Sequence, residues 1–192
     1  MSLTALIRHT RQNHALEHAT VTLLASDAGW ADSAPPRIVG RSDWTGFVLY
    51  GQLDTEVVRR AAWEGLRRLR AGESWLAVHP RCGTNLAAGA LLGGAGAYLV
   101  ASAKDDSRLM RLNRSLLTMT AALLLARPLG EWIQSHLTTT SDLGDVTAIE
   151  VRRELFGFLV PRKQPGTSSG LVVHRVVVVR GAGPQLNRSA QP

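Results

Sequence analysis

Residues 84–103 read Thr-Asn-Leu-Ala-Ala-Gly-Ala-Leu-Leu-Gly-Gly-Ala-Gly-Ala-Tyr-Leu-Val-Ala-Ser-Ala and contain no charged residue. A helix of about 20 such residues is about 30 Å long, the hydrocarbon thickness of a bilayer. Gly89 and Gly93 form a G-x-x-x-G step, which favours close helix packing and suggests a homo-oligomer through this face. The alternative is a buried, Gly- and Ala-rich helix of a soluble protein.

A second apolar segment, Leu116–Ala126, follows a polar link at 104–115. It is too short to span a bilayer unless its helix continues past Arg127 and Glu131. These two residues are four apart, so they can pair on one helical turn. We therefore predict a transmembrane helical hairpin over residues 84–137.

The flanking segments predict an α+β domain into which this hairpin is inserted. Residues 1–83 have the element order α-β-β-α-β: a helix at 3–26, strands at 37–41 and 46–51, a helix capped by Asp54, and a strand at 74–78. Residues 138–182 hold two strands, 146–152 and the β-branched 171–180, which complete the soluble part by pairing as a C-terminal β-hairpin or by joining the N-terminal sheet. Residues 183–192 are predicted to be a disordered tail.

Charge and cysteine content narrow the class of protein. The formal net charge is +7, and only two of the 22 basic residues are lysine. These residues are scattered, which disfavours nucleic-acid binding and is compatible with anionic lipid. Cys82 is the only cysteine, which favours a reducing compartment.

The soluble part is expected on the cytoplasmic side of the membrane, because the N-terminus has no signal-peptide pattern. The basic loop between the apolar segments indicates the opposite orientation.

The segment His14-Ala-Leu-Glu-His18 carries the strongest chemical signal. On a helix, His14 and His18 lie on one face and can share a zinc ion, with Glu17 in reach of a zinc-bound water. The letters H-x-x-E-H are those of the inverzincins. The alternative is an ordinary polar face of an amphipathic helix.

Catalytic zinc usually has three protein ligands, and the segment His79-Pro-Arg-Cys-Gly-Thr-Asn85 offers the third. Cys82 is one candidate and His79 is the other, either as a ligand or as a supporting partner. Thr84 and Asn85 either donate hydrogen bonds to a substrate or cap the following helix. Asp43 and Glu64 are further carboxylates without a supporting motif.

The HALEH and HPRCGTN motifs, followed by a hydrophobic hairpin, resemble a bacterial membrane-protein family known as a domain of unknown function. The resemblance covers most of residues 10–180. It implies two transmembrane helices in a bacterial inner membrane.

The first 70 residues more loosely resemble pitrilysin or insulinase-type zinc peptidases, in which an H-x-x-E-H helix precedes a strand pair and a helix. This resemblance implies that His14 and His18 bind zinc and that Glu17 is the general base. The downstream glutamate ligand of that family has no counterpart in this chain, so Cys82 or His79 would replace it.

We therefore expect a membrane-anchored, zinc-dependent hydrolase that acts on a protein or peptide substrate, with the zinc-bound water activated by Glu17. The alternative is a non-catalytic membrane module that binds a partner protein and has a structural metal site or none. A site closed by His14, His18, His79 and Cys82 would favour this alternative, because catalysis needs an open coordination position.

Overall fold

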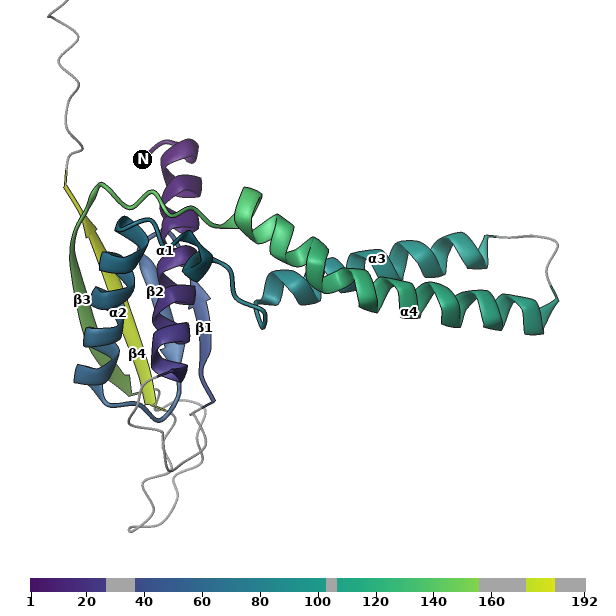
Figure 1. Cartoon of the computed structure of the whole chain (residues 1–192), viewed down its shortest axis with the longest axis horizontal. Coiled ribbons are helices and arrows are strands. Elements are labelled where there is room, and N and C mark those ends of the chain that lie inside the picture. The colour runs from purple at the N-terminus through teal and green to yellow at the C-terminus, as the bar shows by residue number, and fades with distance from the viewer. Residues whose placement is uncertain (27–36, 103–106, 156–171, 182–192) are drawn as a thin grey trace, which may run out of the picture. The chain divides into compact units, whose positions relative to one another are not determined.

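The computed structural model describes residues 1–26, 37–102, 107–155 and 172–181. The chain divides into two compact units, one formed by residues 1–77 with 139–192 and the other by residues 78–138 (Figure 1). The expected tail at 183–192 lies outside the described residues. The first unit contains both helices and strands, in agreement with the predicted α+β fold class, and the second unit is helical.

The first unit contains a four-stranded antiparallel sheet with the order β1-β2-β4-β3. Its strands are β1 (Val39–Ser42), β2 (Gly46–Tyr50), β3 (Val146–Leu155) and β4 (Val172–Arg180). The two C-terminal strands pair with each other, as predicted, and β4 also pairs with β2. Residues from both ends of the chain therefore form one sheet.

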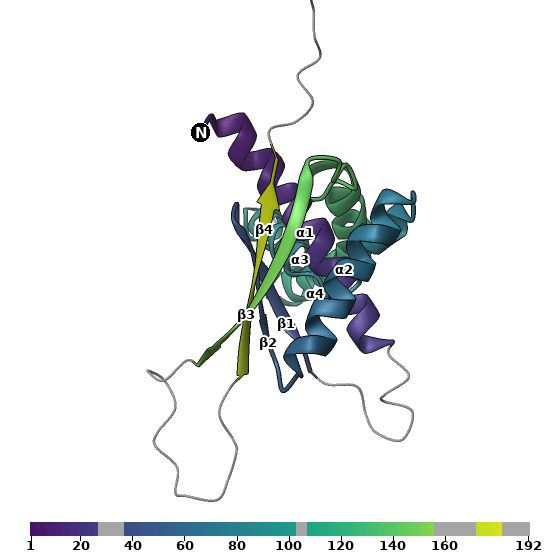
Figure 2. The same cartoon turned by 90° about the vertical axis from the view of Figure 1, so that its left-hand side faces the viewer.

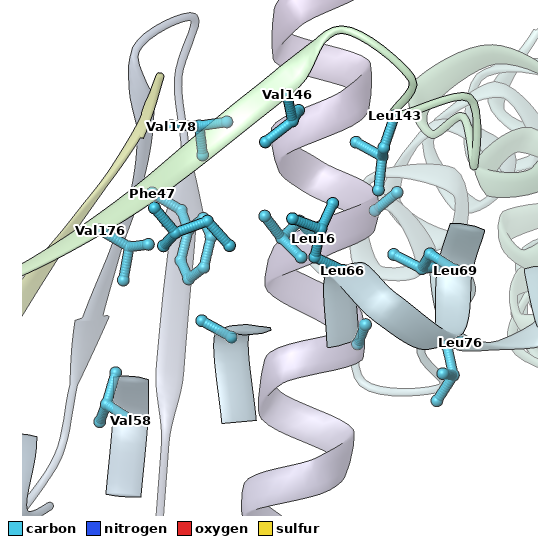
Figure 3. Packing of buried hydrophobic residues seen from close by; sticks show 14 of the residues in the cluster. Leu16, Phe47, Val58, Leu66, Leu69, Leu76, Leu143, Val146, Val176 and Val178 are labelled. Carbon is cyan, nitrogen blue, oxygen red and sulfur yellow. The ribbon is translucent and has the colours of Figure 1, made fainter. Parts of the chain in front are cut away.

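Two helices, α1 (Leu3–Ala25) and α2 (Thr55–Arg70), pack together on one face of this sheet (Figure 2). Asp54 caps α2 as predicted, since its carboxylate accepts from the backbone N–H groups of Glu56 and Val57. The core lies between the helices and the sheet, where Leu16 and Leu66 meet Phe47 and Val176 (Figure 3). Burial of these apolar side chains stabilises the two layers.

The strand predicted at 74–78 is wrong. Ser74–Ala77 form a short 3-10 helix, η2, in which the N–H of Leu76 bonds to the carbonyl of Glu73 at 3.1 Å. Gly72 turns the chain with φ of 94° before this helix. Ser74 and Trp75 are exposed while Leu76 and Ala77 are buried, so burial does not alternate as in a half-buried strand, and the backbone bonds are local.

The second unit is a pair of packed helices, α3 (Gly83–Ala101) and α4 (Arg108–Ile133), with a π-helical turn, η3 (Gln134–Thr138), at its end. We predicted a polar link at 104–115, but α4 already begins at Arg108, so the prediction is wrong for residues 108–115. Ser107 caps α4 by accepting from the N–H of Met110, which lets a polar first turn be helical. The described residues thus show two packed helices in this region, but with one membrane-length apolar helix among them they do not support the predicted transmembrane hairpin.

Glycines of α3 let the two helices approach. A Cβ at Gly89 would lie 3.1 Å from Cβ of Ala126, and one at Gly96 would overlap the methyl group of Thr118. Gly93 has no such neighbour within 4 Å. Of the predicted G-x-x-x-G pair, Gly89 is therefore engaged by α4 of the same chain.

Large apolar side chains lie on the outside of this pair. Six leucines are each more than 70% exposed: Leu86, Leu91, Leu99, Leu117, Leu123 and Leu124. Within the described residues, one helix, Arg108–Thr138, is long and apolar enough to cross a membrane. The predicted Arg127–Glu131 ion pair is present on it at 2.8 Å.

Candidate metal centre

His14, Glu17 and His18 lie at the middle of α1, on the side that contacts β1 and η2. His18 is 3% exposed and Glu17 7% exposed, whereas His14 is half-buried. The ring centroids of the two histidines are 4.3 Å apart. The i, i+4 spacing thus brings both imidazoles together, as predicted from the motif.

Asn13 fixes α1 immediately before His14. Its side chain is fully buried, donates to the carbonyl of Asp43 at 2.7 Å and accepts from Arg180 at 2.6 Å. Because both ends of the amide are bonded, this turn of the helix is held against β4 and the turn that follows β1. The two histidines therefore project from a well-anchored part of the helix.

His18 is held in one tautomer by its hydrogen bond. Its Nδ1 lies 2.7 Å from the carbonyl oxygen of Ala77, at the end of η2. A carbonyl oxygen only accepts, so Nδ1 carries the proton and the ring lone pair is on Nε2. This is the arrangement of metal-binding histidines, whose other nitrogen donates to a carbonyl or carboxylate.

Glu17 is held by β1 through two residues that the motif did not reveal. Ser42 donates a hydrogen bond to Oε2 of Glu17. Gly40 leaves space for the carboxyl group, since a Cβ there would overlap Oε1 and lie 2.6 Å from Cδ of Glu17. The only sequence signal for this contact was that Gly40 and Ser42 are two residues apart in a predicted strand segment and therefore lie on the same face.

The charge state of Glu17 reflects opposing effects. Burial raises the pKa of its carboxyl group above the ordinary value, while the hydrogen bond from Ser42 and the nearby His14 act in the opposite direction. The net shift is upward, so Glu17 accepts a proton more readily than an exposed glutamate.

His14, His18 and Cys82 form a group that could hold a metal ion, because their ligand atoms all lie within 4.8 Å of one another. Donor atoms around a tetrahedral zinc ion are about 3.3–3.8 Å apart, as follows from bond lengths of about 2.0–2.3 Å. The nitrogen and sulfur donors are those that zinc prefers.

His79, the competing third ligand, is not a member of this group. Its Nδ1 accepts from the N–H of Arg81 at 3.2 Å, which places the ring within the turn. Cys82 caps α3, and its sulfur accepts from the N–H of Thr84 at 3.4 Å. The structure thus differs from the expected capping by Thr84 or Asn85, because the cysteine itself is the N-cap.

Asp43 and Glu64, the two further carboxylates that no motif marked as ligands, each pair with an arginine. Asp43 forms a two-pronged ion pair with Arg175, at 2.7 and 2.9 Å. Glu64 pairs with Arg67 on the outer face of α2, at 2.6 and 2.8 Å. Neither belongs to the described metal-ligand group.

Comparison with known proteins identifies the family. Residues 9–151 match the family described as "Domain of unknown function (DUF6391)". An uncharacterized protein of Picosynechococcus sp. is 38% identical over 142 residues, which cover 69% of this chain and 67% of that protein. No solved structure matches. The chain therefore belongs to the DUF6391 family, and the matched range contains all three residues of the metal-ligand group.

Proposed function

We propose that this protein is a membrane-anchored, zinc-dependent hydrolase in which His14, His18 and Cys82 hold the metal and Glu17 is the base. The observation that carries the proposal is the grouping of these three donors beside a buried carboxyl group. Three protein ligands leave one tetrahedral position for water or substrate, which is typical of catalytic rather than structural zinc.

The alternative to an open catalytic site is a closed structural one. A fourth protein donor would occupy the open position, and the sequence offered His79 for that role. Among the described residues the group has three members, and His79 is outside it. We therefore favour catalysis over the alternative of a partner-binding module with a structural metal.

Glu17 is suited to move a proton in such a site. A bound zinc ion would polarise a substrate carbonyl and make water more acidic. A carboxylate in reach of a zinc-bound water is a suitable general base, and burial excludes competing bulk water from Glu17. The bond from Ser42 holds Oε2 and Oε1 lies against Gly40, so the carboxyl group has a fixed position beside the two histidines.

The membrane anchor in this proposal is the helix pair α3–α4. Exposed leucines cover both helices, and water would penalise so large an apolar surface. Lipid tails would cover it without penalty. The substrate would then be a peptide or protein segment at the membrane surface, on the cytoplasmic side.

Cobalt substitution tests the metal centre in the full-length protein purified in detergent. Cobalt bound to a thiolate gives a sulfur-to-metal charge-transfer band, which Cys82→Ser should abolish. His14→Ala and His18→Ala should each weaken cobalt binding by at least tenfold. His9→Ala is the matched control, because His9 is on the same helix but outside the ligand group. A wild-type protein without the band would refute the proposed ligand set.

Two further measurements test catalysis. Adding azide should change the spectrum of the cobalt protein, because an open position accepts an external ligand, whereas an unchanged spectrum would indicate a closed structural site. Cleavage of a peptide library should be detected by mass spectrometry and should fall about 10²–10⁴-fold in Glu17→Gln, which keeps the shape but removes the base. Equal cleavage by that variant would exclude Glu17 as the base.

A further inference from the structure

We propose that Gln134 is a positioning residue that holds the His79–Asn85 turn, and with it Cys82, in the geometry required of a metal ligand. This inference rests on the proposed metal centre. Nothing in the sequence around Gln134 marked it as functional.

Gln134 bonds to both ends of this turn. Its Oε1 accepts from the backbone N–H of His79 at 2.9 Å, and its Nε2 donates to Oδ1 of Asn85 at 2.7 Å. The side chain is fully buried, so neither bond has water as a ready replacement. A glutamine amide has one acceptor end and one donor end, and here each end has a different task.

Asn85 connects Gln134 to a second point of the turn. Its Nδ2 donates to the carbonyl of Pro80 at 2.8 Å. The backbone adds bonds from Cys82 N–H to the carbonyl of His79 and from Asn85 N–H to the carbonyl of Cys82, at 3.2 and 3.0 Å. Cys82 therefore lies in a short loop in which residues on both sides are fixed by one buried amide.

The local backbone brings Gln134 to this position. Gly130, one helical turn earlier, permits the close approach, because a Cβ there would overlap Oδ1 of Asn85 and lie 2.7 Å from its Cα. The chain changes from α-helix to π-helix at Gln134. Single π-helical turns are uncommon and often occur at functional sites.

A turn held only by its own backbone would leave the sulfur free to move by more than the few tenths of an ångström that a metal site tolerates. Supporting residues of this kind typically change metal affinity by about 10–100-fold when replaced. We therefore expect Gln134→Met, which preserves side-chain length but removes both hydrogen bonds, to weaken cobalt binding by about 10–100-fold.

The test measures cobalt affinity by competition with a chelator, together with the sulfur-to-metal band, in full-length protein. Gln134→Met should show a weaker and shifted band at saturating cobalt, while Ser135→Ala, a neighbouring change of an exposed residue, should match the wild type. Far-ultraviolet circular dichroism checks that the helix content is retained. A change in the band reports on the position of the sulfur, which a loss of general stability alone would not alter.

The outcomes separate this inference from the proposed function. A wild-type protein without a band refutes the metal centre itself. A wild-type band that Gln134→Met leaves unchanged in strength, position and affinity refutes the positioning role and leaves the centre intact. If Gln134→Met does not fold, Asn85→Ala removes the bond between Gln134 and Asn85 together with the bond from Asn85 to Pro80, and wild-type behaviour of that variant would equally overturn the inference.

Discussion

Replacing Gly40 by alanine should displace Glu17 from its place beside β1. The added Cβ would overlap Oε1 and lie 2.6 Å from Cδ and 2.9 Å from Cγ of Glu17. Since carbon atoms pack at about 3.5–4.0 Å, the carboxyl group must move by roughly 1 Å and lose its bond with Ser42. Overpacking and the lost charged hydrogen bond together should destabilise the protein by about 2–4 kcal/mol.

The same substitution should have the opposite effect once Glu17 is truncated. Glu17→Ala removes all three atoms that the new Cβ meets. Alanine is favoured over glycine in a strand by about 0.5–1 kcal/mol, so Gly40→Ala should be neutral or stabilising in that background. The double-mutant cycle should therefore give a coupling free energy of about 2–5 kcal/mol, the difference between these two effects of Gly40→Ala.

The assay is urea denaturation followed by tryptophan fluorescence in a Trp132→Phe background. Trp132 is the only tryptophan within residues 78–138, and among the described residues Trp44, Trp63 and Trp75 belong to the α+β unit and report on its unfolding. If Gly40→Ala destabilises the protein equally with and without the Glu17 side chain, the proposed contact between Gly40 and Glu17 is refuted.

Gly46→Ala should destabilise the protein by about 3 kcal/mol or more in the same assay, because its Cβ would overlap the backbone carbonyl of Val176; an unchanged denaturation midpoint would contradict this strand pairing. The ion pair of Asp43 should make the free energy of unfolding decrease in acid. Burial alone would raise its pKa, but hydrogen bonds from Arg175 and from the turn outweigh this and lower it to about 2. The folded pKa is below the unfolded value, so a stabilisation of about 1 kcal/mol, reduced by partial exposure, is lost as pH falls from about 4 to about 2. Asp43→Asn should flatten that slope, measured by denaturation at each pH.

Most elements of the fold were predictable because their signals are local. The helix at α1 and the β-branched strand at β4 follow directly from spacing and residue type. The error at Ser74–Ala77 has a physical origin, since a run of four mostly apolar residues is too short for residue type alone to distinguish a strand from a 3-10 turn. The order of strands in the sheet required contacts between distant segments.

In the candidate site, too, the features with local signals were predictable and those that depend on distant contacts were not. Helical spacing alone places His14 beside His18, and a cysteine near a sharp turn is a recognisable donor. The supporting residues are different, because Ser42 and Gln134 are ordinary polar residues until the fold brings them to their partners. Similarly, the choice of Cys82 over His79 depends on side-chain directions within one turn.

Because β4 lies between β2 and β3, the sheet cannot be completed until the end of the chain has been synthesised. When the ribosome has made α1 to η2, the sheet has only β1 and β2, and the strand that pairs with β2 is more than 120 residues further along the chain. The apolar helices α3 and α4 emerge before that strand does. The nascent α+β unit must therefore wait, with an open strand edge and an uncovered apolar face, until residue 180 has been translated. Assistance by a chaperone during this interval would protect the unit from pairing with other chains.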